Sequence, residues 1–509
     1  MRRALTAITL CAALFLTGCT GEDPQAPETP EVTPSPTLTA QKTPFTLPYY
    51  PNASLHPITS ENRTNLVLCN LVYQPLFELD NHFSPHGVLC ASSSVSEDGL
   101  TWTLTLAEAY FSDGTQMSAD HVAQSLELAR TSAQYAARLA DVTRVRAQED
   151  GTVTLTLLRP NGALPTLLDI PVMYDNGTGA LPLGTGPYVF VEDDGPLRLR
   201  RGASAPDTAP QEISLRAIES ADDLIYAFDA GDISLVTSDL TGANALGYSS
   251  GYEAFDYPTT TMLYVGFQTV SGPCQDVLIR QAVSRSFDRD TVALSLLAGH
   301  AQATCLPVSP DCSLHSEQCE QNGSQNPMAV KELLDLAGCS LREDGLLYKG
   351  RTAQSLVFVV NTDNSFKLTV ADHLVGQLRD LGFSVELRKL SWEDYNKALA
   401  TGTFDLYLGE VALTADFDLT ALLNPAGSLN FGKYDNADTV LLLEQLRAAQ
   451  EPVRTAAAEA LWAQLQAEAP FTPLCFKDHS ILIQWRAVSG LEPTRQNPFY
   501  NIENLRFDA

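Results

Sequence analysis

Positive charge is scarce in this chain. It carries 32 Lys and Arg residues against 61 Asp and Glu residues, which gives a formal net charge of −29 at pH 7. A surface with this balance repels phosphate groups, so the sequence argues against a nucleic-acid partner. The same acidic surface favours solubility and gives a weak preference for cationic ligands.

Signatures of enzyme chemistry are also missing. The chain has no HExxH motif, no Walker phosphate loop and no Rossmann glycine fingerprint, and no pair of carboxylates suggests an acid–base site. Residues 247–251 read GYSSG and match the hydrolase elbow, which requires a buried strand before it and a helix after it. The flanking residues fit neither requirement, so we expect no enzyme and no cofactor.

Long hydrophobic runs are confined to the N-terminal region. Two arginines precede a mostly apolar run that ends in LTGC at Cys19. The run is too short for a permanent span of about 20 residues and fits a signal peptide. LTGC resembles a bacterial lipobox, although a chance cysteine after an ordinary signal peptide is the alternative. We predict a signal peptide over residues 1–18, then a lipidated Cys19 and a Pro- and Thr-rich flexible tether over residues 19–44.

Cysteine is more informative by its spacing than by its number. Eight of the ten cysteines follow Cys19, and an exported chain is in a setting where disulfides form. Cys305, Cys312, His315 and Cys319 share one loop, where the spacing is compatible with disulfides, free thiols or a Cys3His zinc site. Disulfides are the interpretation that we favour.

A second His/Cys group is interrupted by proline. His82, His86 and Cys90 are four residues apart, but Pro85 excludes a continuous helix that would place them on one face. We therefore predict no metal site.

The segment from residue 73 to residue 130 has the clearest structural pattern. Thr101–Leu106 alternates apolar residues with threonines, as in a half-buried strand. A turn at residues 112–115 follows. Ser118 then suits a helix N-cap, and Val122, Leu126 and Ala129 form an apolar stripe behind it. The pattern predicts a strand, a turn and a helix.

These residues also resemble a family signature. YQPLF (73–77), EDGLTWTL (97–104) and FSDGTQMSADHVAQS (111–125) follow the order and spacing found in extracellular solute-binding proteins of dipeptide, oligopeptide and nickel ABC importers. GTGPY at 184–188 and VLIRQAVSRSFDRD at 277–290 are further matches, the second of which we expect to be one helix. The resemblance covers the chain from about residue 45 to its end.

The second half contains a βαβ pattern. Residues 356–360 favour a strand, residues 366–381 carry a helical apolar stripe closed by Gly382, and residues 383–387 favour a returning strand. A connection of this kind joins parallel strands by a right-handed crossover. By itself, the periodicity predicts a multi-domain α/β protein.

The resemblance implies the type II periplasmic-binding-protein fold, an α/β architecture with two lobes. We predict lobe I over residues 45–260 with an inserted domain at about 66–180, lobe II over residues 261–480, and a return to lobe I over residues 481–509. Residues 261–267 are expected to cross between the lobes.

The resemblance also implies a ligand anchor. Peptide-binding members carry an A-D-Y segment whose aspartate pairs with the α-amino group of the peptide, and TADFD places Asp416 at that position beside Thr414. The tryptophan that precedes the segment in the family is absent here, and the spacing is longer. Asp418 and Glu410 are therefore alternative anchors, and a surface-turn role for Asp416 is also open.

These observations predict a non-catalytic, lipid-anchored substrate-binding component of an ABC importer that captures short peptides. Its partners would be the permease and ATPase, and it would act as a monomer at the outer face of the cell membrane or in the periplasm. Alternative ligands are a nickel chelate, haem or an oligosaccharide. The alternative classes are an exported sensory or adhesive lipoprotein and an exported enzyme.

Overall fold

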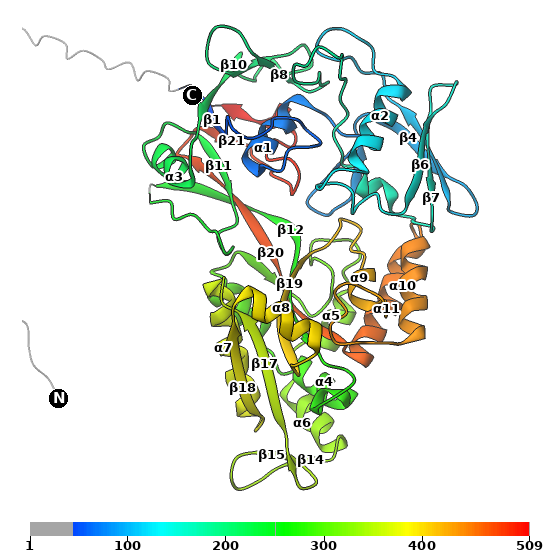
Figure 1. Cartoon of the computed structure of the whole chain (residues 1–509), viewed down its shortest axis with the longest axis vertical. Coiled ribbons are helices and arrows are strands. Elements are labelled where there is room, and N and C mark those ends of the chain that lie inside the picture. The colour runs from blue at the N-terminus through cyan, green and yellow to red at the C-terminus, as the bar shows by residue number, and fades with distance from the viewer. Residues whose placement is uncertain (1–43, 250, 508–509) are drawn as a thin grey trace, which may run out of the picture. The chain divides into compact units, whose positions relative to one another are not determined.

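The computed structural model describes residues 44–249 and 251–507 (Figure 1). The predicted signal peptide, Cys19 and nearly all of the tether lie outside these residues. Within them the chain is a mixed α/β protein. In this part of the chain, no helix is both long enough and apolar enough to cross a membrane.

The chain first builds a four-stranded sheet in the order β1-β10-β9-β8. β1 runs parallel to β10, and the other pairs are antiparallel. The strands are β1 (Thr46–Tyr49), β10 (Glu212–Ala217), β9 (Arg198–Arg201) and β8 (Tyr188–Val191). Helix α1 (Arg63–Val72) contacts both β1 and β8, and begins where the Asn62 side chain accepts a hydrogen bond from the Asn65 amide.

An antiparallel sheet in the order β4-β5-β7-β6 lies within the predicted inserted domain. Its strands are β4 (Cys90–Val95), β5 (Thr101–Leu106), β7 (Val153–Leu157) and β6 (Val142–Ala147), and it is covered by α2 (Ala119–Ala129). The predicted strand–turn–helix is confirmed here. Ser118 is the N-cap of α2, and the predicted stripe of Val122, Leu126 and Ala129 is fully buried. A small hairpin, β2 (Phe77–Leu79) and β3 (Pro85–Gly87), precedes this sheet.

The largest sheet has seven strands in the order β11-β20-β12-β19-β17-β18, with β13 also paired to β20. Its strands are β11 (Leu235–Ser238), β12 (Tyr252–Phe267), β13 (Ala301–Ala303), β17 (Ser355–Asn361), β18 (Ser384–Leu390), β19 (Leu406–Ala412) and β20 (Phe471–Gln484). β17, α7 (Ser365–Asp380) and β18 form the predicted βαβ unit with parallel strands, which confirms that prediction.

Strands β12 and β20 are the longest, and they pair with each other along most of their length (Figure 1). One end of β20 pairs with β11, while the opposite end of β12 pairs with β19. The two strands therefore connect the parts of the chain that were predicted as separate lobes. The predicted crossing at residues 261–267 is the second half of β12, and the residue limits of the lobes remain predictions.

One predicted helix is shorter in the structure. Residues 277–290 were expected to form a single helix, but α4 (Val277–Ser284) ends at Ser284, and a π-helical turn follows at Thr291–Leu296. Arg289 accounts for the break, because its buried guanidinium donates to the carbonyls of Ser284 and Pro473. A charged group in the core needs such partners, and they fix the chain in a non-helical path.

The remaining elements surround these sheets. The helices are α3 (Ala221–Asp229), α5 (Glu317–Gly323), α6 (Pro327–Leu336), α8 (Trp392–Thr401), α9 (Thr420–Leu423), α10 (Ala437–Ala448) and α11 (Val453–Glu468). The small strands are β14 (Cys339–Leu341), β15 (Leu347–Lys349), β16 (Thr352–Ala353), β21 (Val488–Ser489) and β22 (Arg506–Phe507).

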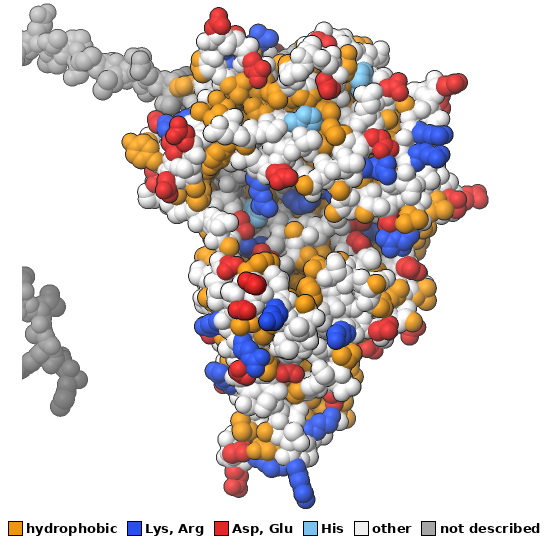
Figure 2. Space-filling model, in the orientation of Figure 1, with side chains coloured by type: hydrophobic (Ala, Val, Ile, Leu, Met, Phe, Trp, Pro, Cys, Tyr) orange, Lys and Arg blue, Asp and Glu red, His pale blue; other side chains and the backbone are white. Residues whose placement is uncertain are grey.

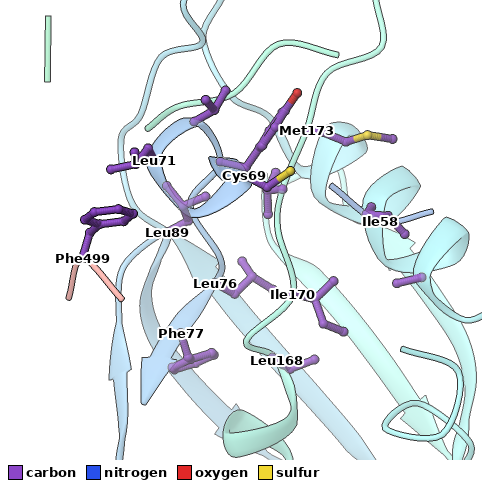
Figure 3. Packing of buried hydrophobic residues seen from close by; sticks show 14 of the residues in the cluster. Ile58, Cys69, Leu71, Leu76, Phe77, Leu89, Leu168, Ile170, Met173 and Phe499 are labelled. Carbon is purple, nitrogen blue, oxygen red and sulfur yellow. The ribbon is translucent and has the colours of Figure 1, made fainter. Parts of the chain in front are cut away.

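The core of the N-terminal part also includes the end of the chain. Cys69 and Leu71 of α1 pack in one buried cluster with Ile170 and with Phe499 near the C-terminus (Figure 3). This packing explains why the chain returns here after β20, since apolar area removed from water stabilises the fold by about 25 cal/mol per Å².

Candidate functional site

A cavity of about 340 Å³ lies beside the two crossing strands. We call it the hinge cavity. Its walls come from α1, the end of β11, the middle of β12 and β20, and the segment after Leu491, and Ala412 of β19 also reaches it. The polar and charged lining residues are Arg63, Thr64, Asn70, Thr237, Ser238, Asp239, Tyr257, Thr259, Thr260, Thr261, His479, Arg495 and Gln496. Residues from both predicted lobes therefore surround one polar space.

A buried lysine pairs with two carboxylates beside this cavity. Lys477 on β20 is 1% exposed, and its Nζ lies 2.8 Å from Asp239 Oδ2 and 3.8 Å from Glu410 Oε2. Burial alone would raise the pKa of Asp239, but the hydrogen bond and charge of Lys477 outweigh it and hold the pKa below its usual value. Lys367 Nζ lies 3.3 Å from Glu410 on its other side. The network joins the end of β11 to β19 through the crossing strand.

His479 adds a neutral group to the same wall. Burial lowers its pKa to about 4, which the nearby carboxylate of Asp239 does not reverse. The imidazole is thus uncharged at neutral pH and offers a nitrogen lone pair.

A second cavity of about 150 Å³ adjoins the hinge cavity, and we call it the inner cavity. The two cavities share Asn70, Arg495 and Gln496 as lining residues. The remaining lining residues are Tyr73, Pro75, Glu78, Gln134, Tyr135, Arg138, Asp169, Pro171 and Asn497. Most of these side chains are polar, although the cavity lies against the main apolar core.

Charge in the inner cavity is only partly compensated. Arg138 Nη1 forms an ion pair with Asp169 Oδ1, whose side chain is 1% exposed. Arg495 forms no ion pair among the described residues, and burial together with the charge of Arg138 lowers its pKa to about 10. Glu78 is hydrogen-bonded by Asn497 at 2.9 Å, and burial raises its pKa. Arg495 is therefore the cation of the inner cavity that has no ion-pair partner among the described residues. Its Nη1 atom is buried, while the residue as a whole is partly exposed.

Asp416, the predicted ligand anchor, lies at neither of these cavities. It is 7% exposed and lines a separate cavity of about 180 Å³, together with Gly162 and Arg454. Its Oδ2 accepts a hydrogen bond from Asn161 Nδ2 at 3.1 Å, and its Oδ1 accepts one from Thr414 Oγ1 at 2.6 Å. Asp416 is thus buried, as an anchor would be, but both of its carboxylate oxygens have protein partners.

The other predicted site residues divide between two places. Thr414 lies with Asp416, and Asp418 follows in the same turn, where its Oδ1 accepts hydrogen bonds from the amide and hydroxyl of Thr420. Burial and the neighbouring Asp416 raise the pKa of Asp418. Glu410 is instead part of the Lys477 network at the hinge.

The structure also adds residues that the sequence patterns did not single out. Asp169 lies in one irregular segment and the adjacent residues Arg495 and Gln496 lie in another, and no local spacing connects the two segments. Lys477 could have been predicted as a buried charge from the sequence, because KDH interrupts the otherwise apolar strand β20. Charged residues at buried strand positions imply buried partners.

The cysteines do not form the disulfides that their spacing favoured. The disulfide prediction is wrong for this structure, because Cys305, Cys312 and Cys319 are buried free thiols, as are the other five cysteines between residues 44 and 507. The loop packs each thiol separately, and Cys319 for example faces the carbonyl of Glu459. No cluster in this described part of the chain could hold a metal ion.

The described residues of the elbow-like GYSSG segment, 247–249 and 251, lie in no helix or strand. Ser249 Oγ donates a hydrogen bond to Asp229 Oδ2, and the next regular element is the strand β12, where a hydrolase would have a helix.

On the face in view, neither acidic nor basic side chains form one continuous patch (Figure 2). Acidic and basic side chains are interspersed over it (Figure 2). The polar contacts available to a ligand therefore depend on the residues that line the cavities.

Comparison with known proteins agrees with this architecture. The model of the bacterial extracellular solute-binding proteins, family 5 (middle), matches residues 84–433. A Brucella ovis protein named as an ABC transporter peptide-binding protein is 26% identical over 275 residues, 50% of this chain and 52% of that one. The glutathione-binding protein GsiB of Escherichia coli K12 is 24% identical over 305 residues, 56% of this chain and 59% of GsiB. The matched regions are thus only about half of these relatives.

A solved structure agrees over a longer stretch. NikZ from Campylobacter jejuni, crystallised with Ni(L-His), aligns over 92% of this chain and 100% of NikZ with a TM-score of 0.63 and 19% identity. The fold is that of the class of type II periplasmic binding proteins. Within that class, the chain belongs to family 5 of the bacterial extracellular solute-binding proteins.

Proposed function

We propose that this protein is the lipid-anchored substrate-binding component of an ABC importer, and that it captures a short peptide between its two lobes. The observation that carries the proposal is the hinge cavity, where residues from both predicted lobes meet beside the long strands β12 and β20. A ligand bound there favours the conformation in which both walls contact it, and so shifts the protein toward a closed state.

The hinge cavity suits the polar backbone of a peptide. Threonine hydroxyls, the Asn70 amide and the Asp239 carboxylate line it. Lys477 forms ion pairs with Asp239 and Glu410 and so holds these carboxylates in place. Such groups bind a peptide main chain and leave side-chain recognition loose. The Brucella and E. coli relatives, whose names refer to peptide and glutathione binding, support this ligand class.

Asp416 remains the proposed anchor for the α-amino group of the peptide, with Thr414 beside it. The alternative anchors are Asp418 in the same turn and Glu410 in the Lys477 network. Burial of Asp416 at a contact between the predicted lobes supports this role. An ammonium group would have to replace Asn161 or Thr414 as the partner of this carboxylate.

The proposal includes the assembly. Acylation of Cys19 would hold the protein at the outer face of the cell membrane or in the periplasm, with the tether between the lipid and the folded part. The closed protein, acting as a monomer, would then deliver its ligand to the permease and ATPase. The family match supports an extracellular or periplasmic location.

Native mass spectrometry of the purified full chain tests the proposal. We expect a bound short peptide that is released on unfolding and that restores the bound mass when added back. If nothing is bound, and pooled dipeptides and tripeptides neither add mass nor raise the melting temperature, the capture function is overturned.

A nickel chelate is the second candidate ligand. His479 faces the hinge cavity with a pKa lowered to about 4, so its neutral imidazole is available as a metal ligand. NikZ, which has the same fold and was crystallised with Ni(L-His), supports this alternative. The same mass measurement after adding Ni²⁺ with L-histidine distinguishes the two ligand classes.

A further inference from the structure

The inner cavity collects polar atoms that have no partner. Eight buried side-chain nitrogen and oxygen atoms in the described residues lack a hydrogen bond, and four of them belong to residues that line this cavity. These four atoms are Gln134 Oε1, Asp169 Oδ2, Arg495 Nη1 and Gln496 Nε2. Buried polar groups are nearly always satisfied in folded proteins, so this concentration indicates a place for a polar ligand.

Two of the four atoms are donors. Arg495 Nη1 belongs to the cation that lacks a counter-ion. Gln496 Oε1 accepts a hydrogen bond from the Leu79 amide at 3.0 Å, which fixes the orientation of the side-chain amide and leaves Nε2 as the free donor. A guanidinium and an amide N–H from residues that line one cavity suit a carboxylate.

The other two atoms are acceptors. Asp169 uses Oδ1 for the ion pair with Arg138 and keeps Oδ2 unpaired, although the side chain is almost fully buried. Gln134 Nε2 donates to the hydroxyl of Tyr135 at 3.1 Å, which leaves Oε1 free. A carboxylate oxygen and an amide oxygen together suit an ammonium group.

Both requirements must be met within a small space. A water molecule needs about 10–15 Å³ of such a cavity, so 150 Å³ holds on the order of ten water-sized groups. An α-amino acid head, with ammonium and carboxylate on one carbon, is smaller than this. The separate ends of an ordinary linear peptide do not share a carbon.

We propose that the inner cavity binds the α-amino acid head group of the ligand. Arg495 and Gln496 hold its carboxylate, and Asp169 and Gln134 hold its ammonium. The ligand is then a free amino acid or a peptide linked through its side-chain carboxyl group. This inference rests on the proposed function and names the substrate class.

The hinge cavity can hold the rest of such a ligand. Arg495 and Gln496 also line the hinge cavity, so a chain leaving the head group passes directly into it. There it would meet Ala412 of β19, on the wall contributed by the second predicted lobe. Recognition of the head and closure on the remainder thus occur in adjoining spaces. This placement and the Asp416 anchor are competing assignments for the ammonium, since Asp416 lines a separate cavity. The inference keeps the proposed capture function and replaces only that anchor.

Two isomeric dipeptides test the inference. γ-L-Glutamylglycine carries an α-amino acid head, whereas α-L-glutamylglycine has the same atoms and net charge but divides the head between two residues. Calorimetry with the full-length protein should show the γ isomer binding at least 10-fold more tightly, because the α isomer leaves one pair of buried groups unsatisfied. Equal binding, or tighter binding of the α isomer, would overturn the inference.

Gln496→Glu is the decisive variant. It keeps an oxygen for the Leu79 amide but replaces the free donor with a carboxylate that repels the carboxylate of the ligand. We expect a loss of at least 100-fold for the γ isomer. Gln445→Glu on the exposed face of α10 adds the same charge elsewhere and should leave affinity unchanged. An unchanged affinity in Gln496→Glu contradicts the proposal.

The outcomes separate this inference from the proposed function. If neither dipeptide nor free L-glutamate binds, but native mass spectrometry finds another ligand, the inner cavity holds only water and the inference alone fails. If no small molecule binds at all, the proposed function fails as well. Arg495→Gln serves as a second variant, with circular dichroism confirming that it folds.

Discussion

Asn161 Nδ2 donates a hydrogen bond of 3.1 Å to Asp416 Oδ2 across 255 residues of sequence. The two residues belong to different predicted lobes. Next to them, the Gly162 amide donates to the Arg447 carbonyl at 2.8 Å, and a Cβ at Gly162 would lie 2.0 Å from the Ala449 carbonyl oxygen. The sequence therefore joins the two parts at a contact that only a glycine permits.

This contact sharpens the test of Asp416 as a ligand anchor. If Asp416 pairs with a peptide α-amino group, Asp416→Ala should cost about 3–5 kcal/mol of binding free energy, which is on the order of 100-fold to a few thousand-fold in Kd. N-acetylating the peptide should weaken the wild type by a similar amount and the variant by much less, since both changes remove one interaction. Calorimetry on the four combinations measures the coupling.

Asn161→Ala is the matched control for that cycle. It removes the same contact between the predicted lobes but leaves the carboxylate in place. Additive losses for Asp416→Ala and N-acetylation, together with an equal effect of Asn161→Ala, would show that Asp416 acts in the lobe contact. Asp418 and Glu410 would then be the next anchors to test.

Ligand binding should bring the lobes together. Because β12 and β20 are the long strands shared by both parts, we expect the radius of gyration to fall on binding while the secondary structure stays constant. Small-angle scattering and circular dichroism with and without a peptide pool measure the two quantities. An unchanged scattering profile at demonstrated saturation would count against closure.

Cys19 should carry the lipid. Cys19→Ala removes the thiol that forms the thioether, so the variant should incorporate no labelled fatty acid and should leave the membrane fraction. Metabolic labelling followed by fractionation checks both. Label retained on the variant would rule out Cys19 as the acylated residue.

Lys477 should be essential for stability. Its replacement by Met leaves Asp239, whose side chain is 25% exposed, without its partner at 2.8 Å. Breaking a pair with one buried member costs up to about 3–5 kcal/mol of the free energy of unfolding. Denaturant unfolding measures the loss. Lys389→Met removes an exposed pair with Asp372 and should cost about 1 kcal/mol or less. Similar losses in the two variants would contradict a structural role for the buried pair.

Asp478 should make stability decrease as the pH rises from about 4 to about 7. Burial, and then the charges of Asp256 and Asp311, raise its pKa to about 7, although Gln302 donates a hydrogen bond to it. Between pH 4 and pH 7 the folded state therefore binds a proton that the unfolded state has released, so the free energy of unfolding falls as pH rises through this window. The full penalty, which is present above pH 7, is up to about 4 kcal/mol at 1.4 kcal/mol per pKa unit.

Asp478→Asn should remove that penalty. We expect a higher melting temperature than the wild type at pH 8 and a much smaller difference at pH 5, measured by thermal unfolding. Asp363→Asn, at an exposed position, should change neither value. A stabilisation of equal size at both pH values would mean that titration of Asp478 is not the cause.

Local pattern was sufficient for many of the regular elements. Thr101–Leu106, the Ser118 cap and the βαβ unit at residues 356–387 are where the periodicity placed them, because each depends on neighbours within a few positions. Helix α4 ended early since Arg289 bonds to a strand almost two hundred residues away. Partners at that distance leave no periodic signal.

The sequence by itself determined the family, the α/β class and the principal strands and helices, since spaced blocks and apolar periodicity are local properties. Only the tertiary structure decided which polar residues share a space. Asp169 and Arg495 meet at the inner cavity because the chain returns after β20 to pack Phe499 beside α1. Long-range packing brings these two charges together, and local sequence patterns do not report a contact between residues so far apart in the chain.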